Sequence, residues 1–110
     1  QISQNGKYAW SGIDYELMQR LQPDSTDIDG LVNTIKDIEG VEIALLFRGV
    51  EAHKTKVSLR SKVWADVNAV AGLFGGGGHM RAAGCTINGT VEEAAERLVP
   101  AVKKYLEEME

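Results

Sequence analysis

Cysteine is almost absent from this chain, because Cys85 is the single cysteine among 110 residues. One cysteine forms no disulfide within the chain, and two histidines far apart in the sequence complete no zinc-binding cluster. Long apolar segments are also missing: the chain holds no run of about 18 apolar residues, and no signal-like segment begins it. These absences argue against a disulfide-stabilised scaffold and a membrane protein, and they predict a soluble protein of the reducing cytoplasm.

Basic residues are fewer than acidic ones, 12 against 16, which gives a formal net charge of −4. This balance argues against a protein that binds nucleic acid over its whole surface. The charge is unevenly distributed, however. Residues 48–81 hold six basic and two acidic residues, a charge of +4, and the remainder holds six and fourteen, a charge of −8. A solvated strand face is one explanation, and an anion-binding segment is the other.

The size and composition fit one globular domain spanning residues 1–110, with 44% hydrophobic and 25% charged residues. The chain begins at Gln1 rather than at methionine, and a strand-like segment follows almost at once. We therefore expect it to be a piece of a longer protein.

Four consecutive glycines, Gly75 to Gly78, lead directly into His79. Each ordered glycine costs about 1 kcal/mol relative to alanine, and one glycine is enough to end a helix. A flexible linker would have polar neighbours, whereas apolar residues flank this run on both sides. The run therefore predicts a backbone that approaches something closely and offers free N–H groups to an anionic ligand, with His79 as a further contact.

The hydrophobic periodicity predicts an α/β domain: a mixed β-sheet of about four to five strands flanked by helices. The predicted strands are 7–10, 41–47, a strand beginning at 54, and 83–88; the predicted helices are 14–22, 27–39, 66–74 and 90–109. Residues 49–53 connect two strands that should form an antiparallel pair. Inside the last helix, Pro100 predicts a kink or a break.

The strand that begins at Lys54 alternates, with Lys56, Ser58, Arg60 and Lys62 on one parity and apolar residues on the other. Residues 58–62 and the glycine–histidine run are close in sequence and together supply a guanidinium, hydroxyls, an ammonium, an imidazole and backbone N–H groups. This set fits a phosphate. The chain has no Walker motif, no dinucleotide-binding glycine motif, no base partner for a serine nucleophile and no ligand set for a metal. We therefore expect it to bind rather than to react, and to hold no cofactor itself.

The residues Ser58-Leu59-Arg60-Ser61, Asp66-Val67-Asn68, the run from Phe74 to His79, and Ala82-Ala83-Gly84 resemble the C-terminal DHH-associated domain of the DHH phosphoesterases. Within that superfamily these motifs are most similar to those of the bacterial oligoribonucleases that also act as pAp phosphatases. The resemblance implies substrate contacts from Arg60, Ser61, Gly76, Gly77, Gly78 and His79, with Ser58, Lys62 and Arg81 as secondary candidates.

The same resemblance implies a separate N-terminal DHH domain in the same protein, which holds manganese and performs the hydrolysis. The Asp-His-His motif is absent here, so no catalytic or metal-binding residue is assigned to this chain. The implied ligand is a short single-stranded oligonucleotide or a nucleotide phosphate, and a homodimer is left open. This chain alone is expected to be inactive.

Alternatives stay open at this point. The domain resembles modules fused to alanyl-tRNA synthetases, so it can be a non-catalytic nucleic-acid-binding module, or a dimerisation or regulatory domain. Within the superfamily, a cyclic dinucleotide phosphodiesterase and a single-strand exonuclease are the competing activities.

Overall fold

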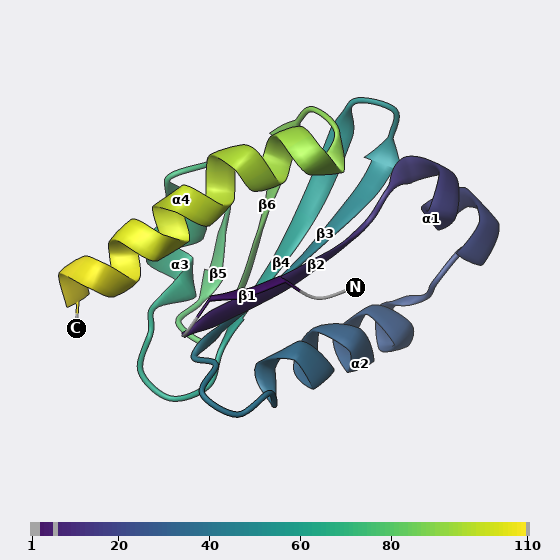
Figure 1. The fold of residues 1–110 in the computed structure, drawn as a ribbon. Helices are drawn as coiled ribbons and strands as arrows, with labels where there is room; N and C mark the ends of the chain where they lie inside the picture. The colour runs from purple at the N-terminus through teal and green to yellow at the C-terminus, as the bar shows by residue number, and fades with distance from the viewer. Residues whose placement is uncertain (1–2, 6, 110) are drawn as a thin grey trace.

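The computed structural model of the chain describes residues 3–5 and 7–109. Six strands and four helices follow one another as β1 (Ser3–Asn5), β2 (Tyr8–Ile13), α1 (Tyr15–Leu21), α2 (Ser25–Lys36), β3 (Ile43–Glu51), β4 (Lys54–Ser61), α3 (Val67–Gly72), β5 (Gly77–His79), β6 (Ala82–Asn88) and α4 (Val91–Met109). Figure 1 shows α4 running along one side of the sheet and α2 lying on the other.

The six strands form one sheet in the order β1-β2-β3-β4-β6-β5. The β2–β3 pair is parallel and every other pair is antiparallel, so the predicted mixed sheet flanked by helices is confirmed. The sheet has six strands rather than four or five, because a three-residue strand that the sequence pattern does not reveal lies at each edge. One of these, β5, is built from the end of the glycine run.

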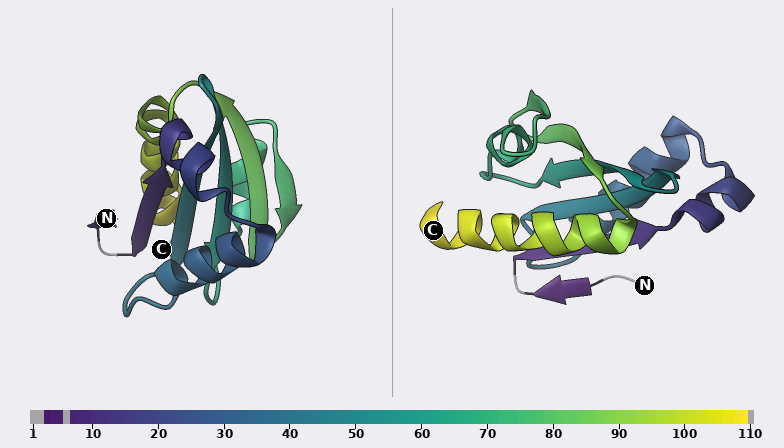
Figure 2. Two further views of the ribbon diagram at one scale, coloured as in Figure 1. Left: turned by 90° about the vertical axis from the view of Figure 1, so that its right-hand side faces the viewer. Right: turned by 90° about the horizontal axis from the view of Figure 1, so that it is seen from above.

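Two hydrophobic cores lie on opposite faces of the sheet (Figures 1 and 2). On one face, α3 and α4 cover the odd-numbered positions of β3 and β4, such as Leu45 and Leu59. On the other face, α2 covers Ala9 of β2 and Ala44 and Leu46 of β3. This second core draws no residue from β4 or β6. That part of the sheet face therefore carries no apolar core next to α2.

The β3–β4 hairpin is longer than the sequence predicts. Strand β3 continues beyond Phe47 to Glu51, and its pairing with β4 shifts between Gly49 and Glu51 at a β-bulge. Gly49 is required there, since a β-carbon at this position would lie 2.6 Å from the backbone nitrogen of Tyr15. The resulting register places Arg48 directly opposite Lys56.

Side-chain caps fix where the longer helices begin. Helix α2 starts earlier than predicted because Asp24 caps it, and Asp24 and Asp27 form a reciprocal capping box. The predicted capping box of α4 is confirmed: the Thr90 N–H donates to Glu93 Oε1 at 2.8 Å, and the Glu93 N–H donates to Thr90 Oγ1 at 3.2 Å. Hydrogen bonds from the backbone and the side chain of Thr90 to the carboxylate lower the pKa of Glu93.

The predicted break at Pro100 is wrong, because α4 is one helix from Val91 to Met109 (Figure 1), whereas the predicted kink stays a prediction. Pro100 is exposed to solvent, as is Glu96, whose carbonyl loses its helical N–H partner. Water can hydrate that carbonyl, and Leu98 and Val102 remain buried on either side of the proline. No helix among the described residues is long and apolar enough to cross a membrane.

Candidate functional site

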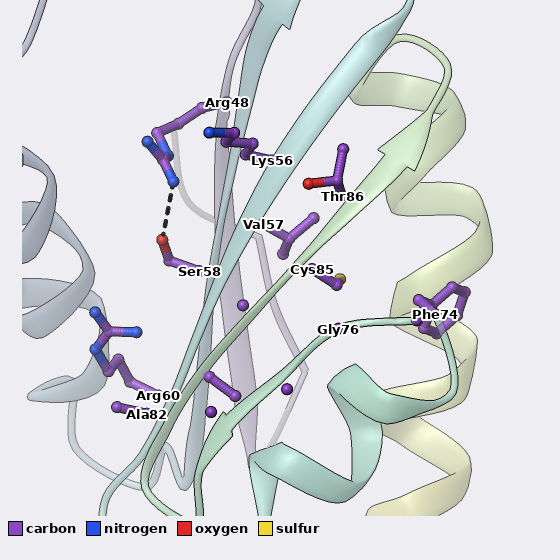
Figure 3. Close-up of a pocket in the computed structure, with 15 residues that line it drawn as sticks. Arg48, Lys56, Val57, Ser58, Arg60, Phe74, Gly76, Ala82, Cys85 and Thr86 are labelled. Carbon is purple, nitrogen blue, oxygen red and sulfur yellow. Dashed lines mark hydrogen bonds between the residues drawn. The ribbon is translucent and has the colours of Figure 1, made fainter.

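A cleft of about 560 Å³ opens where β4, β6 and the glycine run meet (Figure 3). Its lining consists of three cations, a group of small or uncharged residues from β4 and β6, and the segment that leads into β5: Arg48, Lys56, Arg60; Val57, Ser58, Ala82, Ala83, Gly84, Cys85, Thr86; and Phe74, Gly75, Gly76, Gly77, Gly78. From the two segments that the sequence singles out, the structure thus brings together Ser58 and Arg60 with Gly75 to Gly78.

The floor of the cleft is hollow because small residues face one another across β4 and β6. Ser58 pairs with Gly84, and Arg60 pairs with Ala82, so the long side chain of Arg60 meets no bulky partner on β6. Since residues two apart in a strand share a face, Lys56, Ser58 and Arg60 line the same side of β4. In Figure 3, Arg48, Ser58 and Arg60 extend toward that side.

The Arg60 guanidinium is only partly satisfied by the protein. Its Nη1 donates to the Leu59 carbonyl oxygen at 3.0 Å, and its Nη2 lies 3.3 Å from Oδ1 of Asp29 on α2. Asp29 is largely exposed, so this ion pair contributes little to stability and is readily exchanged for another anion. Arg60 remains available to a ligand in the cleft.

Three of the four N–H groups of the glycine run are not free, contrary to what the sequence suggests. The Gly75 N–H donates to the Gly72 carbonyl, the Gly76 N–H to the Ala71 carbonyl at 3.0 Å, and the Gly78 N–H to Asn68 Oδ1 at 2.9 Å. These three groups are occupied within the protein, so the expectation that they are offered to a ligand is wrong. The glycine run lines the cleft with its backbone and leaves room in it.

A positive φ or close packing explains three of the four glycines, Gly75, Gly76 and Gly78. Gly75 has a positive φ of 78°, which favours glycine. A β-carbon at Gly76 would overlap β6, and one at Gly78 would lie 2.7 Å from the Ala82 carbonyl oxygen. Gly77 is different, since a β-carbon there would meet only Asn68 Oδ1, at 3.2 Å. The close approach that the glycine run predicts is therefore an approach to the protein's own β6.

The remaining candidate residues lie outside the cleft lining. Ser61 belongs to the opposite face of β4, where its buried hydroxyl donates to the Ala65 carbonyl at 2.6 Å. Lys62 Nζ donates to the Ile38 carbonyl at 3.1 Å, and Arg81 Nη1 donates to the Ala65 carbonyl at 3.0 Å. His79 is exposed on β5, opposite Ala82 and next to the cleft. The side chains of Ser61, Lys62 and Arg81 thus donate hydrogen bonds to backbone carbonyls of the protein itself.

Sequence reasoning missed Glu42, which lies in an apolar run immediately before β3. Its buried carboxylate accepts the N–H groups of Val63, Trp64 and Ala65, with Oε2 2.8 Å from the last two. Burial raises the pKa of Glu42, but these N–H groups and the charge of Arg81 outweigh it, so the pKa lies below its ordinary value. Glu42 therefore fixes the turn that follows β4. In the sequence, the feature that could have revealed it is a single charged residue among apolar ones.

Arg48 and Lys56 were also missed as site residues, although both belong to the basic segment. Finding Arg48 requires the register of the β3–β4 hairpin, which depends on the bulge at Gly49. Cys85 lines the cleft too, but burial raises the pKa of its thiol to about 11, so it is no thiolate nucleophile at neutral pH. Among residues 3–5 and 7–109, no three histidine, cysteine or acidic side chains gather as a metal site.

Comparisons with known proteins agree on one family. The model of the DHHA1 domain matches residues 6–108. The bifunctional oligoribonuclease and PAP phosphatase of Thermus thermophilus is 37% identical over 81 residues, which cover 73% of this chain and 25% of that protein. An exopolyphosphatase-related protein from Bacteroides fragilis superposes with a TM-score of 0.78 at 32% identity, over 89% of this chain and 29% of that one.

A pGpG-specific phosphodiesterase from Vibrio cholerae superposes with a TM-score of 0.59 at 12% identity, over 94% of this chain and 34% of that one. This last likeness concerns the fold alone. The chain spans between 25% and 34% of the length of these three proteins.

Proposed function

The chain belongs to the DHHA1 domain family, and from this premise we propose that it binds the substrate of a phosphoesterase acting on short oligonucleotides or nucleotide phosphates. The observation that carries the proposal is the cleft in which Arg60 and the glycine run converge. Its chemistry suits a phosphate, because a guanidinium can grip phosphate oxygens bidentately and the Ser58 hydroxyl can donate or accept a further hydrogen bond.

Identity to the Thermus thermophilus enzyme supports an oligoribonuclease and PAP phosphatase substrate class. The similar region covers 25% of that enzyme, so hydrolysis is assigned to the protein as a whole and not to this chain. We place the hydrolytic centre, with manganese, in a DHH domain that precedes this one in the same protein. The described part of this chain offers no set of ligands for such an ion.

In this division of labour, the DHHA1 cleft positions the substrate phosphate and the DHH domain breaks the phosphoester bond. Removing Arg60 should therefore weaken substrate binding and raise KM. The chemical step should change less, because no group that transfers a proton or attacks phosphorus is assigned to this chain.

The test compares this 110-residue chain with the longer protein that contains a DHH domain. Each is assayed with Mn²⁺ on pApA and on adenosine 3′,5′-bisphosphate. We expect hydrolysis by the longer protein only, and a raised KM when it carries Arg60→Ala. The matched control is Arg97→Ala, which removes an exposed arginine from α4.

Turnover by the highly purified chain, abolished by a chelator, would contradict the assignment of hydrolysis to another domain. An unchanged KM in Arg60→Ala would contradict the substrate-binding role of the cleft.

A further inference from the structure

The guanidinium of Arg48 is not fully hydrogen-bonded within the described part of the protein. Arg48 lies on β3 at the edge of the cleft, and its Nε is buried with no hydrogen-bond acceptor among the described residues. Its Nη2 donates weakly to Ser58 Oγ at 3.4 Å. A buried donor without an acceptor is costly, and the cost is higher for a charged group. An anion in the cleft, which Arg48 lines, would supply an acceptor once the guanidinium turns toward it.

Like charges surround Arg48. Lys56 lies directly opposite on β4, and Arg60 is near enough that its charge, after burial, lowers the pKa of Arg48. Asp29 is the carboxylate that opposes this effect, and it is already paired with Arg60. Three cations and one carboxylate leave a formal charge of +2 around the cleft. Such a group is stabilised by an anion that carries two negative charges.

We propose that Arg48 is a second anion-binding arginine, which with Arg60 makes the cleft select phosphate ligands carrying two negative charges over those carrying one. This inference rests on the proposed function and deepens it. One dianionic terminal phosphate supplies two charges, and so do two consecutive phosphodiesters. Ser58 lies between the two arginines along the sheet face, where its hydroxyl can contact the same anion (Figure 3).

The test uses three probes with the 110-residue chain at pH 7.5. Adenosine 5′-monophosphate is a dianion there, because the second pKa of a phosphate monoester is about 6. Its phosphate methyl ester is a monoanion with the same nucleoside. The trinucleoside diphosphate ApApA carries two phosphodiesters and no terminal phosphate.

We expect the monophosphate or ApApA to bind at least about tenfold more tightly than the methyl ester, the gain of one hydrogen bond to a charged group. If only the monophosphate binds more tightly than the methyl ester, the cleft selects a terminal phosphate. If only ApApA does, the cleft selects consecutive phosphodiesters. The Arg48 Nε–H resonance should shift on binding. Equal affinities for all three probes would overturn the inference.

Variants separate a role in binding from a role in folding. The quantity compared is the affinity for the tighter-binding doubly charged probe divided by the affinity for the methyl ester. Arg48→Gln should bring this ratio close to one. Arg48→Lys should keep part of the preference, since lysine retains the charge but not the fork geometry. Arg97→Gln, which removes an exposed charge on α4, should leave the ratio unchanged. The ratio is measured between two ligands on the same folded protein, so a loss of stability does not change it.

Failure of the inference and failure of the proposed function look different. If Arg48→Gln keeps the native ratio while Arg60→Ala abolishes binding, the role of Arg48 is overturned and the proposed function stands. If the native chain binds none of the three probes saturably, both are overturned.

Discussion

Gly76 and Gly84 lie so close together that a β-carbon at position 76 would overlap the carbonyl oxygen of Gly84. The same β-carbon would lie 2.6 Å from the Cβ of Cys85. The backbone of the glycine run therefore packs directly against β6. This contact keeps the run at the edge of the sheet, where it borders the cleft.

Replacing Gly76 with alanine should destabilise the domain, by about 1–3 kcal/mol, because the added methyl group forces β5 and β6 apart. Thermal and urea unfolding measure the effect. Gly72→Ala is the matched control, since a β-carbon there has nothing within 4 Å, and it should be neutral or slightly stabilising. Equal stabilities of the two variants would contradict the packing of Gly76 against β6.

Gly77→Val should behave differently from Gly76→Ala. Its β-carbon would meet only Asn68 Oδ1, at 3.2 Å, and this exposed side chain can yield by a few tenths of an ångström while still accepting the Gly78 N–H. The melting temperature should therefore change little. The bulk added beside the cleft should weaken binding of adenosine 5′-monophosphate on the order of tenfold or more. Calorimetric melts and titrations on the same samples provide both numbers. A large fall in melting temperature with unchanged affinity would show that Gly77 is purely structural.

Glu42→Gln should cost about 2 kcal/mol of unfolding free energy, because an amide cannot accept the three N–H groups as a carboxylate does. The folded-state pKa of Glu42 is lowered from 4.5. Its contribution is therefore complete above pH 4.5 and is lost as the pH falls through the lower folded pKa.

Urea unfolding between pH 2 and pH 7, about the range in which carboxyl groups titrate, checks this. The stability difference between the native protein and Glu42→Gln should shrink with acidification. Glu96→Gln, which changes an exposed carboxylate on α4, should stay within about 0.5 kcal/mol of the native protein. A difference that is constant with pH would contradict the role of the Glu42 charge.

Sequence reasoning recovered the fold because most elements carry a clear period. The alternation beginning at Lys54 and the amphipathic pattern of α4 both reappear in the structure. Strand β5 was missed because glycine has no side chain to show a period and is unfavourable in strands. A break at Pro100 was wrongly predicted because the cost of a proline depends on its exposure, which the sequence does not state.

The site was recovered in part for similar reasons. Arg60 and the glycine run carry a motif, and the structure places both at the cleft. Ser61 shares the motif, yet the alternation already assigns it the parity of Leu59, and it lies on the core face. Arg48 depends on a hairpin register that a single bulge sets, so no local pattern identifies it.

The most direct test of the central claim is an NMR titration of the 110-residue chain with adenosine 5′-monophosphate at low and high salt. The amides of residues 58–62 and 75–79 should shift saturably, Asp29 should shift with them as its pair with Arg60 is exchanged, and affinity should fall as salt rises. Arg60→Ala should abolish the shifts, and Arg97→Ala should preserve them. Shifts confined to the rest of α2, or unchanged affinity in Arg60→Ala, would contradict the account.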